Sequence, residues 1–309
     1  MPYKIDKYNL ITITGATAGG KTSVAAHLAK KLDTEIISAD SRQVYKNMDI
    51  GTGKDIEDYI IGGFIVPHHI INIVEAGYKY NVYEFQKDFF KAYENITSRG
   101  KLPILCGGTG MYIEAVLKNY ELVQVPVNPE LRRSLENKTI SELEHILKIY
   151  KSLHNKSDLD TTKRAIRAIE IAEYYLRNKL QPAKNPEINS LNIGILFDRD
   201  ERRSRITQRL KQRLENGLIE EVEKLIDNGL KYEDIEYYGL EYKYVSWYLS
   251  GKINYDELFS QLNSAIHQFS KRQMTWFRKM EKAGMKIHWI NGNIPMNDKI
   301  EEILKLLVI

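Results

Sequence analysis

Short runs of apolar residues recur along the chain and alternate with longer amphipathic stretches. Six runs have the length and β-branched content of buried strands, and they cover residues 10–13, 35–38, 69–72, 103–106, 192–197 and 286–290. Helical periodicity occupies stretches between them, such as 23–32 and 82–98. Because strands that alternate with helices form parallel sheets, the pattern predicts an α/β fold whose sheet is covered by helices on both faces.

The segment from 112 to 190 breaks this alternation. Its periodic stretches cover 130–137, 140–153 and 162–177 without a convincing strand between them, and a loop-like stretch rich in proline follows at 181–186. After residue 190 the strand pattern resumes, and long charged helices follow. The sequence therefore predicts a core formed by residues 1–111 and 191–309, interrupted by an all-helical insertion at 112–190.

Length and composition indicate an enzyme-sized protein with a large core. The chain has 309 residues, 43% of them hydrophobic, and its net charge of +4 is too small to indicate a nucleic-acid partner by itself. The single cysteine, Cys106, excludes an internal disulfide framework and a Cys/His zinc site. Since no apolar run reaches membrane-spanning length and the first residues lack a signal-peptide core, we expect a cytoplasmic protein with no membrane partner and no zinc, monomeric by default.

A glycine-rich octet lies between the first predicted strand and a predicted helix. It reads Gly15-Ala16-Thr17-Ala18-Gly19-Gly20-Lys21-Thr22, a complete G-x-x-x-x-G-K-T phosphate-binding loop. Glycines let consecutive N–H groups point into one concavity, where the helix N-terminus adds its positive end. Lys21 then supplies a charge to the terminal phosphate, and the Thr22 hydroxyl a ligand for Mg²⁺. A plain glycine turn is the alternative, but the four fixed positions and the flanking elements favour a diphosphate or triphosphate site.

Two further segments place polar groups directly after predicted strands. Asp40 follows the second strand, so we expect it at the carboxyl edge of the sheet, where ligands of such folds bind. There it can hold Mg²⁺ through water, accept a proton from an attacking group, or only cap the next turn. The segment Leu105–Gly110 repeats the strand-then-glycine pattern, and a tight turn explains it as well as a ligand contact does.

Basic residues gather in two stretches of the second half of the chain. Arg202, Arg205, Arg209 and Arg213 recur at three- and four-residue spacing, so they share one helical face and repel one another unless an anion offsets them. In the segment 268–279, cations interleave with aromatic residues, a combination that can neutralise phosphates and stack on a base. An amphipathic helix with inward aromatics explains that composition at least as well.

Taken in order along the chain, these motifs resemble those of the tRNA dimethylallyltransferases, also called tRNA isopentenylpyrophosphate transferases. The matching segments are 15–22, 38–45, 48–54, 67–71, 107–109, 205–209, 217–222 and 271–278. The resemblance implies a P-loop NTPase-like fold whose loop holds the diphosphate of dimethylallyl diphosphate, with Mg²⁺ as cofactor. It implies that the dimethylallyl group passes to the exocyclic amine of the adenosine just 3′ of the anticodon in tRNA, a base that must flip out of its loop to react.

The resemblance also implies roles for individual residues. Asp40 is the expected base, Thr17 and Arg209 flank the reacting carbon and its leaving oxygen, and Lys21 and Thr22 hold the diphosphate with Mg²⁺. The helical insertion is expected to grip the anticodon stem. The expected tRNA contacts are Asp40, Ser41, Arg42, Gln43, Thr109, Asp160, Thr161, Thr162, Lys163, Arg164, Lys271, Arg272, Gln273, Met274, Thr275, Trp276, Phe277 and Arg278.

Two segments depart from the family pattern, and other functions stay open. Asp160–Arg164 lacks the Asn-Asp pair that usually precedes the basic residues, and Gly239-Leu240-Glu241 stands where Gly-Tyr is expected. The alternatives are a small-molecule kinase that uses ATP, a prenyltransferase for free adenine nucleotides, and a non-catalytic RNA-binding protein switched by a nucleotide. A kinase leaves the insertion and the segment 271–278 unexplained, and a large insertion favours a macromolecular substrate.

Overall fold

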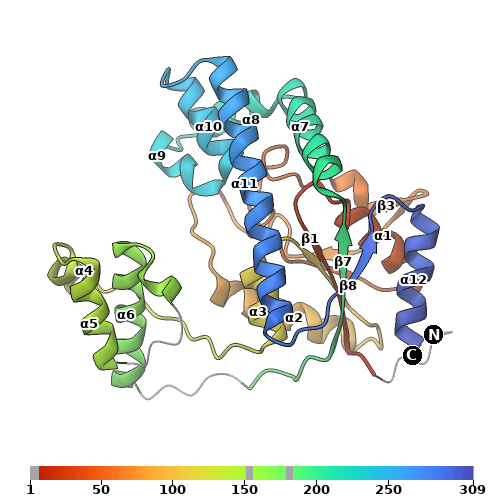
Figure 1. Ribbon diagram of the computed structural model, residues 1–309, viewed down its shortest axis with the longest axis horizontal. Helices are drawn as coiled ribbons and strands as arrows, with labels where there is room; N and C mark the ends of the chain where they lie inside the picture. Colours follow the sequence, from red (N-terminus) through yellow and green to blue (C-terminus); the bar gives the residue numbers. More distant parts are fainter. Residues whose placement is uncertain (1–6, 151–155, 179–183, 309) are drawn as a thin grey trace. The chain divides into compact units, whose positions relative to one another are not determined.

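The computed structural model describes residues 7–150, 156–178 and 184–308 (Figure 1). The chain divides into two compact units, a larger one formed by Met1–Tyr120 with Asn185–Ile309 and a smaller one formed by Glu121–Lys184. The smaller unit lies inside the insertion expected at 112–190, and its boundaries are narrower at both ends. None of the described helices is long and apolar enough to cross a membrane.

A six-stranded parallel sheet forms the centre of the larger unit. Its strands are β1 (Leu10–Gly15), β2 (Ile36–Ser38), β5 (His68–His69), β6 (Ile104–Gly107), β7 (Ser190–Leu196) and β8 (His288–Asn291). They lie in the order β5-β2-β6-β1-β7-β8, with Ile13 of β1 aligned to Cys106 on one side and to Ile193 on the other. The predicted parallel sheet is therefore confirmed, and each of the six predicted runs contributes a strand.

A small antiparallel hairpin, which the sequence analysis missed, lies outside this sheet. It pairs β3 (Ile60–Ile61) with β4 (Phe64–Ile65). Gly62 and Gly63 both have positive φ angles and form the two-residue turn between these strands. The Lys30 ammonium donates to the Ile61 carbonyl at 2.8 Å, which anchors the hairpin to the first helix.

Consecutive residues of the central strands point to opposite faces of the sheet, as a strand period of two requires. In β1, Leu10 joins one hydrophobic cluster, while Ile11 and Ile13 join the other. Helices α1 (Lys21–Leu32) and α12 (Met296–Val308) cover the face of Ile11 (Figure 1). The opposite face is covered by α2 (Val82–Thr97), α3 (Gly110–Leu117) and α11 (Tyr255–Lys282). Because both faces are covered, the carboxyl edge is where loops can form a site.

Helices after β7 extend the same core beyond the carboxyl edge of the sheet (Figure 1). They are α7 (Arg199–Glu215), α8 (Leu218–Asp227), α9 (Tyr232–Ile235) and α10 (Leu240–Leu249). The start of α7 is fixed by Asp198, whose carboxylate accepts the N–H groups of Asp200 and Glu201. The arginine-rich stretch thus begins directly at the end of β7.

The smaller unit consists of helices in the part that the structure describes. They are α4 (Pro129–Leu135), α5 (Ile140–Tyr150), the short η2 (Lys156–Leu159) and α6 (Thr162–Asn178). Its own core contains Leu143, Leu147 and Ile169. Glu170 is buried among these helices and forms ion pairs with Arg132, at 2.9 Å, and Arg167. The unit therefore has a separate core, as the all-helical prediction requires.

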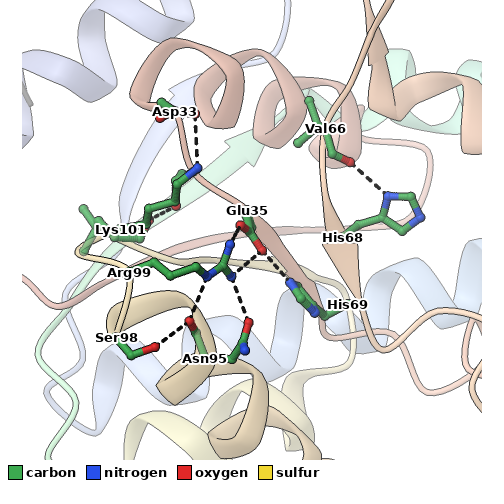
Figure 2. A network of polar contacts seen from close by, with 11 residues as sticks. Asp33, Glu35, Val66, His68, His69, Asn95, Ser98, Arg99 and Lys101 are labelled. Atoms are coloured by element: carbon green, nitrogen blue, oxygen red, sulfur yellow. Dashed lines mark hydrogen bonds and ion pairs between the residues drawn. The ribbon is translucent and has the colours of Figure 1, made fainter.

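At the amino end of the sheet, a buried carboxylate joins three elements (Figure 2). Glu35 precedes β2 and is only 4% exposed. The Arg99 guanidinium, which follows α2, donates to both Glu35 oxygens, and the His69 Nε2 of β5 lies 2.8 Å from one of them. The hydrogen bond from Arg99 lowers the pKa of Glu35, against the opposing effect of burial. This cluster, Glu35 with His69 and Arg99, ties β2, β5 and α2 together.

Candidate active site

The phosphate-binding loop connects β1 to α1 at the carboxyl edge of the sheet. Gly20 has a φ of +65° and begins α1 without a side-chain cap, and the first turn of α1 contains no acidic residue. The positive end of this helix therefore stays uncompensated by the helix itself. Gly15 is required where the chain passes β7, because a Cβ there would lie 2.7 Å from the Ile195 carbonyl oxygen. The local backbone is thus that of an anion-binding loop.

The Lys21 side chain turns back along this loop. Its ammonium donates to the Ala16 carbonyl at 2.8 Å. Burial lowers the pKa of Lys21 to about 8, and the neighbouring Arg209 acts in the same direction. A bound anion would favour the charged form and raise this pKa again. Lys21 is therefore a desolvated cation that gains from a phosphate beside it.

A cavity of about 610 Å³ lies between the loop and one face of α7. The helix contributes Arg205, Gln208, Arg209, Gln212 and Arg213 to its lining. Arg205 Nε donates to the Ala18 carbonyl at 3.0 Å, and its guanidinium lies 4.4 Å from the centre of the Phe197 ring. Three of the four arginines predicted to share a face thus line this cavity, and Arg202 does not.

A second cavity, of about 390 Å³, meets the first at Lys21, Thr22, Arg209 and Arg213, which line both. Its other walls come from the loops after β2 and β6, from α11 and from the segment between α9 and α10. Cys106 also lines it, and burial raises the pKa of this thiol to about 12, so that it stays protonated. The two cavities therefore join at the cations that surround the phosphate loop.

Asp40 lies in the lining of the second cavity. Its Oδ1 accepts the backbone N–H of Arg42 at 2.8 Å, so the carboxylate also forms the turn after β2. The loops after β2 and β6 touch, since the Thr109 N–H donates to the Ala39 carbonyl at 3.2 Å. Gly107 permits this approach, because a Cβ there would lie 2.2 Å from the Ala39 oxygen. Asp40 therefore caps the turn after β2 and also lines the cavity.

Gln273 of α11 connects the phosphate loop to the loop after β6. Its Oε1 accepts the backbone N–H of Thr17 at 2.8 Å, and its Nε2 donates to the Gly108 carbonyl at 2.9 Å. The side chain is buried, and both hydrogen bonds link residues far apart in the sequence. Thr17, expected beside the reacting carbon, is thus held in place by a residue that the sequence analysis expected only to contact tRNA.

The remaining wall of the site is the loop Met48–Lys54. The Glu221 carboxylate accepts three consecutive backbone N–H groups, those of Asp49, Ile50 and Gly51, at 2.7–2.9 Å. Lys54 is fully buried and donates to Asp49 at 2.6 Å, as well as to Tyr45 and Asn72. The loop is therefore held from both ends, which fixes Gly53 next to the arginines of α7.

The expected tRNA-contact residues of α11 divide into two sets. Lys271, Arg272, Thr275 and Arg278 are exposed. Gln273, Met274 and Phe277 are buried, and Phe277 is part of the core. Trp276 packs so closely on Gly110 that a Cβ there would meet its ring at 2.4 Å. The cations are thus exposed, whereas Phe277 and Trp276 pack inward, as in the amphipathic-helix interpretation.

The other expected tRNA contacts lie in two places. Asp40, Ser41, Arg42, Gln43 and Thr109 all line the second cavity. Gln43 is buried there and donates to the Gly53 carbonyl at 2.9 Å, so it supports the loop Met48–Lys54. The segment Asp160–Arg164 lies in the smaller unit, where Arg164 forms an ion pair with Asp160 at 2.6 Å. Asp160, Thr161, Lys163 and Arg164 are exposed, and Thr162 is half-buried.

Some site residues were not singled out by their sequence. Tyr237 lines the second cavity, with the Arg42 guanidinium 5.1 Å from its ring centre. Glu241 lines it too and forms an ion pair with Arg213 at 3.0 Å. Arg213 was predicted to share a helical face with Arg209, whereas nothing in the sequence pairs residue 241 with residue 213.

The donor set beside the loop fits a magnesium ion. The Thr22 and Ser23 hydroxyls and the carboxylates of Asp55 and Asp58 line the same cavity. Hard oxygen ligands of this kind suit Mg²⁺, which keeps several waters and takes few protein ligands. The described residues contain no group of three or more His, Cys, Asp or Glu side chains that could hold a metal ion by themselves.

Fold and site together define the class of proteins with a phosphate-binding loop on a parallel sheet. The family model for IPP transferase matches residues 43–280, and that for isopentenyl transferase matches residues 8–62. Two relatives called tRNA dimethylallyltransferase are similar over nearly their whole length. One from Phocaeicola vulgatus is 57% identical over 98% of this chain and 99% of its own, and one from Parabacteroides distasonis is 59% identical over 97% and 98%.

Solved structures agree with this assignment. The tRNA isopentenylpyrophosphate transferase of Bacillus halodurans superposes with a TM-score of 0.70 at 33% identity, covering 96% of this chain and 95% of its own. A eukaryotic dimethylallyltransferase acting on tRNA superposes with a TM-score of 0.74 at 23% identity, over 92% and 73%, which supports the fold. The chain therefore belongs to the tRNA dimethylallyltransferase family.

Proposed function

We propose that this protein transfers a dimethylallyl group from dimethylallyl diphosphate to the N6 amine of the adenosine just 3′ of the anticodon in tRNA. The observation that carries the proposal is the junction of the two cavities at Lys21, Thr22, Arg209 and Arg213. One cavity has the features of a diphosphate site, and the other contains a carboxylate and an aromatic wall. A kinase acting on a small molecule has no use for this second cavity together with an exposed basic helix.

The reaction requires a base for the amine and stabilisation for the leaving group. The N6 lone pair forms a bond to the first carbon of the dimethylallyl group, while the electron pair of the carbon–oxygen bond leaves with diphosphate. Asp40 accepts the proton that N6 loses. Thr17 lies in the same cavity, where its loop position is fixed by Gln273. The products are N6-isopentenyladenosine in tRNA and diphosphate.

The cations at the junction stabilise the negative charge that develops on the leaving diphosphate. Lys21 and Arg209 hold this charge in a partly desolvated site, where electrostatic stabilisation is stronger than in water. Thr22, with Asp55 or Asp58 through water, is where Mg²⁺ would be held, and a bound magnesium ion would neutralise phosphate oxygens. Backbone N–H groups at the start of α1 complete the cradle.

The RNA-binding assignment rests on exposed cations. Lys271, Arg272 and Arg278 are exposed on α11, and Arg272 also lines the cavity that contains Asp40. Arg164 and its neighbours are exposed on the smaller unit, to which we assign contacts with the anticodon stem. Phosphate neutralisation by such residues positions an RNA without reading its sequence. We also infer that the protein acts in the cytoplasm, as a monomer.

The decisive experiment is mass spectrometry of nucleosides from an anticodon stem–loop incubated with protein, Mg²⁺ and dimethylallyl diphosphate. We expect a prenylated adenosine at the position 3′ of the anticodon, and none in a stem–loop with guanosine there. Prenylation of free adenine nucleotides but not of the stem–loop would assign the smaller substrate. An unmodified RNA bound by folded protein would indicate a binding protein, and phosphorylation of a small molecule from ATP would indicate a kinase.

A further inference from the structure

Arg213 is placed beside the predicted catalytic arginine without having an assigned role. It lies one helical turn after Arg209 on α7, and its side chain is only 13% exposed. Both guanidiniums converge on Gly53. A Cβ at that position would lie 1.8 Å from Arg213 Nη2 and 2.3 Å from Arg209 Nη2. Two cations, the nearly buried Arg213 and the half-buried Arg209, therefore meet at one point of the loop Met48–Lys54.

Each of the two arginines forms an ion pair with one carboxylate. Arg209 contacts Asp55 at 2.7 Å, and Arg213 contacts Glu241 at 3.0 Å. The first cavity is lined by four cations, Lys21, Arg205, Arg209 and Arg213, and by two carboxylates, Asp55 and Asp58. Burial and the charge of Arg209 both lower the pKa of Arg213, which shows that its surroundings oppose its positive charge. A bound anion would favour the charged form of Arg213 and raise this pKa.

The hydrogen bond to Glu241 uses only one of the two terminal nitrogens of the Arg213 guanidinium. Nη1 donates to Glu241, whereas Nη2 is the nitrogen next to Gly53 and to Arg209 Nη2. A planar guanidinium held by one nitrogen can present the other to a phosphate oxygen without further loss of side-chain freedom. Glu241 belongs to the segment that departs from the family pattern, so its role does not follow from the resemblance.

We propose that Arg213 is a second arginine for the diphosphate of the donor, and that Glu241 is the positioning residue that holds it there. This inference rests on the proposed function only in assigning diphosphate to the cavity. Glu241 has two opposing effects, since it orients the guanidinium and also offsets part of its charge. Removing that charge while keeping the shape should therefore tighten diphosphate binding, whereas a merely structural ion pair would predict no change or a loss.

The test is calorimetric titration of the full-length protein with inorganic diphosphate, with and without Mg²⁺. Arg213→Gln should bind about tenfold to a hundredfold more weakly than the unmodified protein, as expected for a lost charge-assisted contact. Arg213→Lys should fall in between, because it keeps the charge and loses the fork. Glu241→Gln should bind on the order of threefold to tenfold more tightly. The double variant should match Arg213→Gln, because Glu241 acts only through Arg213.

Arg203→Gln is the matched control. It removes the same charge from the same helix at an exposed position that lines neither cavity, so diphosphate affinity should stay within twofold. Equal affinities for Arg213→Gln and the unmodified protein, with intact thermal unfolding, would overturn the inference. So would unchanged or weaker binding by Glu241→Gln, which a merely structural ion pair predicts. Should Arg213→Gln fail to fold, an unchanged affinity of Arg213→Lys would overturn it instead.

The proposed function can fail separately. The unmodified protein could bind diphosphate with this dependence on residue 213 and still leave the stem–loop unmodified. That result would support the role of Arg213 and contradict the proposed transferase function. If it prenylates the stem–loop while Arg213→Gln changes neither diphosphate affinity nor rate, only the present inference is lost.

Discussion

Charges are balanced at the amino end of the central sheet, whereas cations are in excess at its carboxyl end. At the amino end, the buried carboxylate of Glu35 is in contact with Arg99 and His69, so the charge is balanced within the fold. At the carboxyl end, four cations line one cavity with two carboxylates, and two of the guanidiniums converge on Gly53. Removal of one partner from a balanced cluster leaves the others unpaired and destabilises the fold, whereas crowded like charges are stabilised when an anion binds. The difference separates a structural cluster from a functional one.

The largest effect is expected at the carboxyl end, for Asp40→Asn. Asn keeps the shape and the hydrogen bond to the Arg42 N–H but cannot accept a proton at neutral pH. The single-turnover rate of prenylation should fall by about 100-fold to 10,000-fold, while affinities for tRNA and diphosphate stay within a few-fold. Rapid-quench measurement of prenylated RNA checks this. Weak diphosphate binding that high Mg²⁺ restores would instead assign Asp40 to the metal, and an unchanged rate would leave it a capping residue.

A smaller effect, on stability alone, is expected at the amino end for Glu35→Gln. The variant leaves the Arg99 and His69 donors without a carboxylate, which should cost roughly 2 kcal/mol in the free energy of unfolding at pH 7. Denaturant titrations measure this loss, and diphosphate affinity should not change. A variant as stable as the unmodified protein but weaker in diphosphate binding would reverse the assignment of the two ends.

The pH dependence of that loss sharpens the test. The pKa of Glu35 is lowered in the folded protein, chiefly by the hydrogen bond from Arg99, so its contribution is present above the unfolded pKa of 4.5. As the pH falls below that value, through the lower folded pKa, the contribution disappears. The difference in unfolding free energy between the unmodified protein and Glu35→Gln should therefore shrink as the pH falls below the unfolded pKa of 4.5. A constant difference would show that the carboxylate charge is not what stabilises this end.

Gln273→Ala should have a moderate effect at the carboxyl end. The substitution removes the acceptor of the Thr17 N–H and the donor to Gly108, and it leaves the phosphate loop less fixed. We expect kcat/KM for prenylation to fall by about tenfold, which is the size of one lost buried hydrogen bond. Gln268→Ala makes the same substitution at an exposed position of the same helix that lines neither cavity, and it should leave kcat/KM unchanged. If both variants behave alike, α11 does not position the loop.

The smallest effect is expected for the exposed cations of α11. Lys271→Ala, Arg272→Ala and Arg278→Ala should each reduce the dependence of tRNA affinity on salt by about one unit of log–log slope for each lost phosphate contact. Binding isotherms at several salt concentrations check this, with diphosphate affinity as the control. An unaltered slope in the triple variant would mean that these side chains are only solvated.

Features that leave a periodic pattern or a characteristic loop composition could be predicted from the sequence. Six strands, the parallel sheet and the phosphate loop follow from local patterns, and the structure confirms the fold. Periodicity does not tell which neighbour a helix packs on, so the end of the core was placed at 111, although Ile113 and Val116 of α3 are buried in the main cluster. The β3–β4 strands, two residues long each, are too short for a periodic signal, and only their Gly62-Gly63 turn marks them.

The candidate site was predictable in part for the same reason. Asp40 lies in the loop after β2 and Lys21 at the end of the loop after β1, so their place at the carboxyl edge could be inferred from position alone. The partners of α7 could not, because the bonds from Arg213 to Glu241 and from Arg209 to Asp55 join residues that only the tertiary fold brings together. Composition also could not separate the exposed Arg278 from the buried Phe277 beside it.

Gly53 tolerates substitution less well than the residues that surround it. Neighbouring side chains can be exchanged for smaller ones, but glycine has no smaller replacement, and its φ of +64° disfavours every other residue. A substitution at 53 would displace two arginines in a single step, whereas changes at 55 or 241 alter the charge around only one of them. In a library of random variants selected for a new diphosphate donor, adaptive changes should accumulate at positions 55 and 241 while position 53 tolerates none.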